Sequence, residues 1–342
     1  MIEFLKRGLL TTVQDIGRYG YQRMGINVAG AMDELALALA NILVGNAPET
    51  EALEVTVLGP TLKFHQANIF AISGADFGAR LNGQPIELNR AYLAQAGSIL
   101  ELPVAKRGAR AYIAFSGGLA ADCLMESKST YMKGVIGGIH GRAALDGDTL
   151  AFCAPRCSLP NLPYRFLGED YGIHYCAHPV IRVLLGPQDD YFSAKGIETF
   201  LSSEYTVSKE NDRMGYRLTG PAIEAAEGCD GNIISDGISF GAIQVPTDQP
   251  IIMMADHQTT GGYAKIAHVI AVDLPLVAQL KTGDTMRFRA VGVEEAQDLY
   301  LQRYQMLCET ARHLNEDKIS RKTENQVRIN GQSFHVLVAE LK

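Results

Sequence analysis

The stretch Thr282-Gly283-Asp284-Thr285-Met286-Arg287-Phe288 places a glycine turn directly before residues that alternate between apolar and polar side chains. Alternation with a period of two is typical of a strand with one buried face. The same pattern occurs at residues 96–102 and 146–152. A late hairpin of this kind is expected where a barrel closes, so the copies near 150 and 286 predict two similar barrels. Such turns also precede strands in unrelated β proteins, which leaves open a chance repeat.

The rest of the chain extends this β-rich prediction. Short apolar stretches bounded by Gly, Pro or Asp predict strands at residues 99–102, 111–115, 181–185, 242–245, 251–254 and 286–290. Two segments instead have helical spacing, namely residues 33–44 after a capping Asp33 and residues 294–314. The predicted fold class is therefore mainly β with a few helices.

A proline-rich stretch, residues 154–179, has no clean periodicity and is typical of a linker. We therefore predict an N-terminal β-rich domain over 1–160, with one helix near 33–44, and a barrel domain over 161–293. A C-terminal helix and hairpin tail would occupy 294–342. Within this tail, residues 327–338 predict a hairpin around Asn330-Gly331, which we expect to pack onto an edge strand.

Composition excludes several functional classes. The chain has 342 residues, of which 47% are hydrophobic and 20% charged, and this mixture supports a sizeable globular core. A net charge of −7 without a Lys/Arg cluster argues against nucleic acid as a partner. No window has the ~18 uncharged apolar residues of a membrane span, and the first residues lack a signal pattern. We expect a cytoplasmic protein without membrane association.

The cysteines and histidines give no standard metal motif. Six cysteines occur without a CxxC pair, and we expect them to be reduced thiols. His174, Cys176 and His178 alternate close to Cys153 and Cys157, and such soft ligands suit zinc. Their spacing matches no zinc pattern, so we predict no metal site.

Two familiar catalytic templates are not satisfied. Residues 237–241 match G-x-S-x-G, but a nucleophile elbow requires a following helix, and residues 242–246 predict a strand that ends in Pro246. Ser239 is therefore expected to be a turn residue. No G-x-x-x-x-G-K-[ST] occurs, so a P-loop is excluded and any ATP is bound by another device.

Polar residues cluster after the apolar strand predicted at 251–254. We expect residues 259–262 to form a turn whose backbone N–H groups can approach an anion or a carbonyl oxygen. Asp256, Tyr263 and Lys265 would converge on the same place. The alternative is a structural turn that Asp256 merely caps.

A second polar cluster, Asn211-Asp-Arg-Met-Gly-Tyr-Arg-Leu218, contains two guanidinium groups. The planar fork of Arg213 suits bidentate recognition of a carboxylate or a phosphate. The alternative is an exposed Asp212–Arg213 pair, which would contribute little.

Several short motifs of the sequence, in order, resemble the signature of the PxpC/KipA family, also described as allophanate hydrolase subunit 2 and biotin-dependent carboxyltransferase-like. They are residues 11–18, 30–33, 40–46, 127–131, 186–188, 212–218, 243–246 and 258–263. The resemblance implies two cyclophilin-like β-barrel halves, as in the carboxyltransferase region of urea carboxylase. It implies ATP-dependent opening of 5-oxo-L-proline to L-glutamate by a 5-oxoprolinase complex, together with PxpB/KipI-like and PxpA-like subunits.

With this resemblance, the polar clusters become candidate site residues. We expect Asp256 to act as general base or orienter, and Arg213 and Lys265 to stabilise the phosphoryl group or substrate carboxylate. Substrate contacts are expected from Gln258, Thr259, Thr260, Gly261, Gly262, Tyr263, Met214 and Tyr216, and from Lys128, Ser129 and Tyr131 in the first half. ATP, with Mg²⁺, would be shared with partner subunits. Asn211, His257 and Ala264 depart from the family's motifs, so the resemblance assigns them no contacts.

Two other functions remain open. One is a biotin-dependent carboxyltransferase subunit similar to urea carboxylase, although no Ala-Met-Lys-Met acceptor occurs, so no covalent biotin is expected on this chain. The other is a non-catalytic KipA-like regulator that binds a KipI-like partner.

Overall fold

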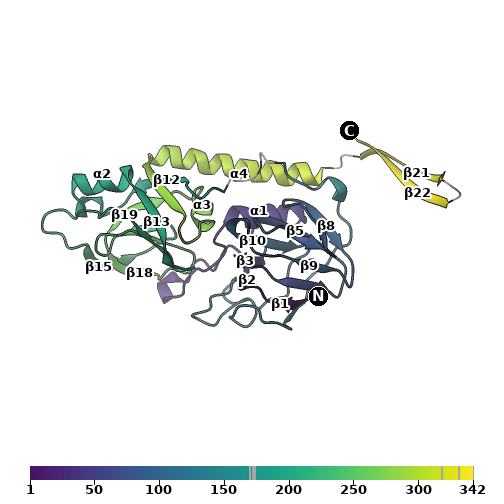
Figure 1. The fold of residues 1–342 in the computed structure, drawn as a ribbon, viewed down its shortest axis with the longest axis horizontal. Coiled ribbons are helices and arrows are strands. Elements are labelled where there is room, and N and C mark those ends of the chain that lie inside the picture. The colour runs from purple at the N-terminus through teal and green to yellow at the C-terminus, as the bar shows by residue number, and fades with distance from the viewer. Residues whose placement is uncertain (169–170, 172–174, 317–318, 330–331, 342) are drawn as a thin grey trace.

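Two β-rich lobes lie next to each other, and the long helix α4 (Val293–Asn315) runs along both (Figure 1). The computed structural model describes residues 1–168, 171, 175–316, 319–329 and 332–341. The end of α4 packs Leu307, Ala311 and Leu314 into the cluster formed by α1 (Glu34–Leu43). One helix therefore bridges the two lobes, and the mainly β fold class is confirmed.

The first lobe consists of two sheets with one core between them. Its elements are β1 (Ile2–Lys6), β2 (Leu10–Gln14), η1 (Gln22–Met24), α1, β3 (Ala52–Thr56), β4 (Thr61–Phe64), β5 (Asn68–Asp76), β6 (Arg80–Leu81), β7 (Gln84–Pro85), β8 (Ala91–Ala94), β9 (Ile99–Glu101), β10 (Arg107–Phe115), β11 (Thr149–Leu150) and η2 (Leu162–Tyr164). The sheet orders are β11-β1-β4-β9-β6-β7 and β2-β3-β10-β5-β8. Phe4 and Phe64 from one sheet meet Phe70 and Phe115 from the other in a shared core.

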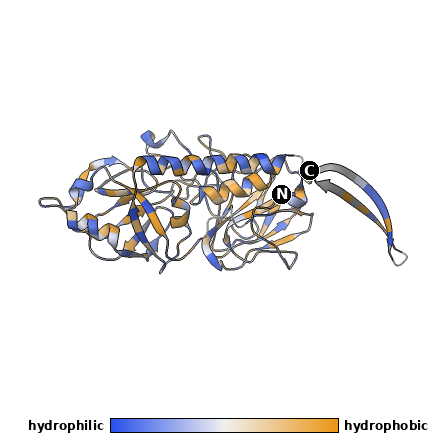
Figure 2. Cartoon of the chain, turned by 90° about the horizontal axis from the view of Figure 1, so that it is seen from above, coloured by the Kyte–Doolittle hydropathy of each residue, from blue (hydrophilic) through white to orange (hydrophobic). Residues whose placement is uncertain are grey.

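The helix predicted over residues 33–44 is confirmed as α1, which covers the outer face of the five-stranded sheet. The Asp33 carboxylate accepts a hydrogen bond from the Ala36 N–H at 2.9 Å and so caps the first turn. Nearly every side chain of α1 is buried, because the sheet lies under the helix and α4 lies over it. Figure 2 shows the result as a hydrophobic α1 beneath a largely hydrophilic α4.

The second lobe is a closed barrel. Its elements are β12 (Val180–Leu185), η4 (Asp189–Tyr191), α2 (Ala194–Ser202), β13 (Glu204–Asn211), β14 (Gly215–Thr219), β15 (Asn232–Gly237), β16 (Ala242–Gln244), β17 (Ile251–Met253), β18 (Thr260–Tyr263), β19 (Lys265–Val269), α3 (Leu274–Ala278) and β20 (Thr285–Ala290). The strands close in the order β12-β19-β16-β17-β14-β13-β20, while β15 and β18 form a separate ribbon. Ile181, Val207, Ile252 and Ile266 fill the interior. The predicted barrel is confirmed for this half.

The three glycine turns of the sequence pattern are confirmed. Gly97, Gly147 and Gly283 have φ angles of 90°, 87° and 93°, values that favour glycine because it lacks a Cβ. Each lies just before a strand, namely β9, β11 and β20.

The C-terminal strands β21 (Ile319–Ile329) and β22 (Gln332–Leu341) form a sheet of their own that projects from the body (Figure 1). The hairpin is therefore confirmed, although Asn330 and Gly331 lie outside the described residues. The expectation that it packs onto an edge strand is wrong, since its strands pair only with each other. Phe334 and Val338 consequently remain exposed on one face.

Deleting residues 317–342 is expected to leave the melting temperature of the remaining chain within about 2 °C of the full-length value. The two lobes and α4 contain the hydrophobic clusters of the described chain, and the hairpin contributes to none of them. Differential scanning calorimetry of both forms measures the effect. A drop of about 10 °C or more would show that the hairpin supports the body.

Candidate functional site

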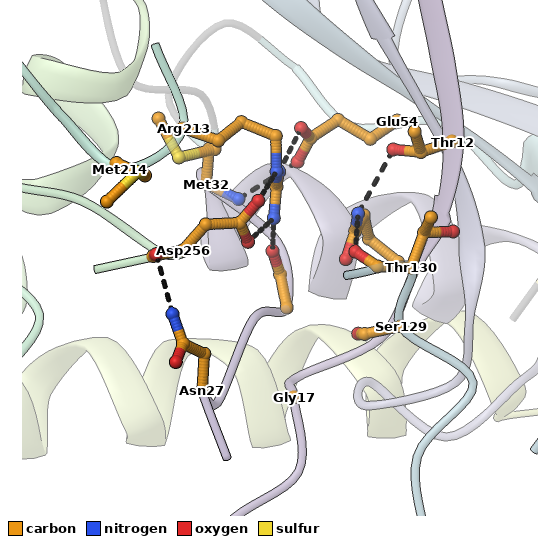
Figure 3. Close-up of polar contacts among 12 residues, drawn as sticks. Thr12, Gly17, Asn27, Met32, Glu54, Ser129, Thr130, Arg213, Met214 and Asp256 are labelled. Carbon is orange, nitrogen blue, oxygen red and sulfur yellow. Dashed lines mark hydrogen bonds and ion pairs between the residues drawn. The ribbon is translucent and has the colours of Figure 1, made fainter. Parts of the chain in front are cut away.

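A buried ion cluster joins the two lobes at their interface. Arg213, between β13 and β14, donates from Nε and Nη2 to the Asp256 carboxylate at 3.1 and 3.0 Å. From the other lobe, its Nη1 donates to the carboxylate of Glu54 on β3, and its Nη2 donates to the Gly30 carbonyl at 2.6 Å. Figure 3 shows the guanidinium between the two carboxylates. Every nitrogen of Arg213 is thus committed to the protein.

The Arg213 guanidinium and the carboxylates of Asp256 and Glu54 are all charged, and each sign stabilises the other. Burial lowers the pKa of Arg213, but the charges of Asp256 and Glu54 outweigh it and raise this pKa above its ordinary value. Burial likewise raises the pKa of Glu54, yet Arg213 and Arg110 hold it below its usual range. The sequence alternative of an exposed Asp212–Arg213 pair is wrong, because Asp212 instead accepts from the Met214 N–H at 2.8 Å.

Asn27 adds a second set of hydrogen bonds between the two lobes. Its amide donates to the Asp256 carbonyl at 2.9 Å (Figure 3) and to the His257 carbonyl at 2.7 Å. Together with Glu54 and Gly30, it fixes the segment that follows β17. The first lobe therefore determines how Asp256 and its neighbours are presented.

An open groove of about 470 Å³, the barrel groove, lies on the barrel face beside this cluster. Its lining residues are Lys209, Glu210, Asn211, Asp212, Met214, Gly215, Arg217, Gln244, Ile251, Met253, Gln258 and Tyr263. Three of the expected substrate residues, Met214, Gln258 and Tyr263, are brought together here. The ammonium of Lys133 contacts the sulfur of Met214, so the first lobe reaches the edge of this groove.

The expected turn at residues 259–262 is wrong. Residues 260–263 form strand β18, which pairs antiparallel with β15, and the Thr259 carbonyl accepts from the Ile238 N–H at 3.1 Å. Gly261 is constrained by packing, since a Cβ there would lie 2.4 Å from Ile238 Cδ1 and 2.9 Å from Gln244 Nε2. The segment offers strand geometry beside the barrel groove and no cradle of turn N–H groups.

Lys265 and Asp256 have different partners. The Lys265 ammonium pairs with Asp236 on β15 at 2.9 Å, and this hydrogen bond lowers the pKa of Asp236. Lys265 opposes Gln244 in the barrel register, which places it next to a groove residue without lining the groove itself. Tyr216 is fully buried, and its hydroxyl accepts from Arg110 at 2.5 Å.

Of the three site residues expected from the first lobe, Tyr131 lies within electrostatic range of Asp256. Burial and the charge of Asp256 raise the pKa of its phenol. Lys128 pairs with Glu51 at 2.8 Å, and the Ser129 hydroxyl donates to Asp15 at 2.5 Å. These two contacts fix the conformation of the segment 128–129 in the first lobe.

Some residues of the site were not found from the sequence. Glu54 carries a signal, because it is a lone acid in the apolar strand Ala52–Thr56, and such an acid needs a buried partner. Lys209 and Arg217 on the groove rim carry none, since exposed cations on strands are ordinary. Gln244 is likewise inconspicuous in the sequence.

His174, the first residue of the possible zinc motif, lies outside the described residues. In the part of the chain that the structure describes, no group of three or more His, Cys, Asp or Glu side chains is arranged to hold a metal ion. None of the helices there is long and apolar enough to cross a membrane.

Comparison with known proteins places these features in a family. The family model described as carboxyltransferase domain, subdomain A and B, matches residues 24–290. The chain is 39% identical over 301 residues to a 5-oxoprolinase subunit of Haemophilus influenzae, a match that covers 87% of this chain and 94% of that protein. It is 36% identical over 298 residues to the Escherichia coli protein of the same name, covering 86% and 93%.

A solved structure shares the arrangement of lobes. The urea carboxylase of Kluyveromyces lactis superposes with a TM-score of 0.85 at 30% identity over 94% of this chain. This chain corresponds to only 31% of that larger protein.

Proposed function

Because the chain belongs to the carboxyltransferase domain family and is similar to known 5-oxoprolinase subunits over 87% of its length, we propose that it is a subunit of an ATP-dependent 5-oxoprolinase. The complex would hydrolyse 5-oxo-L-proline to L-glutamate with PxpB/KipI-like and PxpA-like partners. The observation that carries the proposal is end-to-end coverage, since 94% of the Haemophilus protein is matched but only 31% of the urea carboxylase chain.

The barrel groove suits a small polar substrate. It combines amide and phenol groups from Gln244, Gln258 and Tyr263 with the apolar side chains of Ile251 and Met253. Such a mixture can enclose a five-membered ring and hydrogen-bond its edges. Within this proposal, Gln258, Tyr263 and Met214 line the approach to the lactam.

The buried ion cluster has a positioning role in the same proposal. Arg213 has no nitrogen left for a ligand, and both Asp256 oxygens accept from it. These two residues therefore hold the segment that leads to Gln258 and β18. Lys265, whose ammonium meets the half-exposed Asp236, is the candidate to stabilise developing negative charge.

ATP would activate the lactam by transfer of its γ-phosphoryl group to the carbonyl oxygen with release of ADP, after which attack of water would open the ring and release phosphate. The barrel groove offers the Lys209 ammonium and the Arg217 guanidinium, the latter paired with Glu210 at 3.0 Å. These cations suit a rim contact with an anionic group. Most of the nucleotide would be bound by the partner subunits.

Reconstitution of the three subunits tests the proposal. The full mixture is expected to release glutamate and ADP from 5-oxoproline and ATP, and omission of this chain is expected to abolish glutamate release. The complete complex should first be isolated by size-exclusion chromatography. Undiminished turnover without this chain would remove it from the reaction.

A second candidate is a biotin-dependent carboxyltransferase subunit, favoured by the urea carboxylase superposition at a TM-score of 0.85. This function requires a biotinylated partner, so avidin would inhibit the native complex. A 5-oxoprolinase without biotin is insensitive to avidin. A complex that binds its partners but turns over neither substrate would instead support a regulatory role.

A further inference from the structure

Arg18 is a buried cation whose guanidinium is mostly unpaired. Its side chain is 1% exposed, and only Nη2 has a partner, the carbonyl of Ser129. Among the described residues, Nε and Nη1 have no hydrogen-bond partner. Leaving buried charged donors unsatisfied costs free energy, so the site requires an acceptor that the surrounding chain does not supply.

The nearby carboxylates of Asp15 and Asp256 do not accept hydrogen bonds from Arg18. Two serine hydroxyls and two backbone N–H groups donate to Asp15 at 2.5 to 2.8 Å, and Asp256 is taken by Arg213. Burial lowers the pKa of Arg18 more than the more distant charges of Asp15 and Asp256 raise it. The cation therefore has no contact ion pair within the described chain.

Gln14 is a buried residue whose acceptor, rather than its donor, has no partner in the part of the chain that the structure describes. Its Nε2 donates to Thr12 Oγ1 at 3.0 Å and to the Thr130 carbonyl at 3.1 Å. Because a carbonyl only accepts, this orientation of the amide is fixed, and Oε1 is left without a donor. Three of the six buried side-chain atoms without a partner in the described chain thus belong to Gln14 and Arg18.

The two side chains are anchored to consecutive carbonyls, those of Ser129 and Thr130. The segment 131–141, which contains left-handed residues, packs against Arg18. A Cβ at Gly137 would lie 2.8 Å from Arg18 Nη2, and Val135 and His140 adopt φ angles of 54° and 51°. Left-handed backbone at a β-branched residue costs energy and clusters at ligand-gated segments.

We propose that Arg18 and Gln14 recognise the lactam substrate directly, Arg18 through its carboxylate and Gln14 Oε1 through its ring N–H, after the segment 131–141 opens. The ligand class is a small cyclic amide that carries a carboxylate, whose acceptor and donor match the two unpaired groups. The inference rests on the proposed function, and it names residues outside the barrel groove as the specificity determinants.

The test compares 5-oxoproline with 2-pyrrolidinone, which has the same ring without the carboxylate. Arg18→Met is expected to raise the KM for 5-oxoproline by about 10- to 100-fold in the assembled complex and to leave 2-pyrrolidinone turnover unchanged. Arg18→Lys should restore part of the preference, because it keeps the charge and loses the planar fork. Equal losses for both lactams would indicate a structural role and overturn the inference.

Binding to the isolated full-length chain supplies a readout independent of turnover. Calorimetric titration should show 5-oxoproline binding that is weakened about 10- to 100-fold by Arg18→Met and also weakened by Gln14→Met. Arg90→Met, which removes an exposed pair with Glu87 in the same lobe, is the matched control and should bind normally.

Three outcomes overturn the inference. The first is unchanged lactam binding in both variants, which would mean that an internal water satisfies the unpaired atoms. The second is Arg18-dependent binding of inorganic phosphate without lactam binding, and the third is equal binding of both lactams. If the wild-type complex turns over no lactam, the proposed function fails, while Arg18-dependent 5-oxoproline binding still upholds the recognition site.

Discussion

Replacement of Arg213 by methionine is expected to lower the free energy of unfolding by about 3–5 kcal/mol. The substitution leaves Glu54 and Asp256 buried without their shared cation, and an unpaired buried charge is far more costly than an exposed one. Urea denaturation followed by circular dichroism measures the change. Since the cluster spans both lobes, the loss should also weaken their mutual packing.

Arg217→Met provides the matched control on the neighbouring strand. Arg217 pairs with Glu210 in an exposed setting, with side chains 54% and 77% accessible, so its removal should cost no more than about 1 kcal/mol. Similar losses for the two variants would contradict a stabilising role for the buried cluster.

The same cluster predicts a pH dependence. The folded-state pKa of Glu54 lies below its ordinary value, so its contribution is fully present above the unfolded-state pKa of about 4.5. It is lost as the pH falls through the lower folded-state pKa. Stability of the wild type, measured by urea denaturation at a series of pH values, should therefore fall below about pH 4.5, more steeply than that of Glu54→Gln.

Lys265→Met is expected to reduce glutamate release by the assembled complex by about 10²- to 10⁴-fold, the usual cost of losing a group that stabilises developing charge. The fold should survive, because methionine replaces the buried stem and Asp236 remains 57% exposed to water. Initial rates at saturating ATP, together with the melting temperature, separate these two effects.

Lys195→Met on α2 is the control, since Lys195 is 80% exposed and pairs with an exposed Glu224. It should retain wild-type turnover. A Lys265→Met complex that also retains turnover would remove this lysine from the reaction and leave the groove amides as the remaining polar contacts.

Local features of the fold were readable from the sequence because they depend on neighbouring residues. Asp33 caps a helix whose first turn it precedes, and the turn glycines at 97, 147 and 283 need positive φ angles. The hairpin strands follow the same logic. Whether the hairpin packs onto the body could not be predicted, because the packing of one segment on a distant one depends on surfaces that short sequence patterns do not encode.

The candidate site illustrates the same limit. The segments around Arg213 and Asp256 stood out as polar clusters, but their mutual pairing and the contribution of Glu54 link residues 43 and 159 positions apart. The two glycines at 261 and 262 suggested a turn, whereas Gly261 is constrained by the close approach of Ile238. The domain boundary at residue 160 stays a prediction.

If this chain itself binds the lactam, its own backbone should be protected when the lactam is bound. Hydrogen exchange of the assembled complex, read by mass spectrometry with and without 5-oxoproline, measures this protection. Slower exchange on lactam binding is expected in residues 14–18 and 256–263 of this chain. Protection confined to the partner subunits would show that they, and not this chain, bind the lactam.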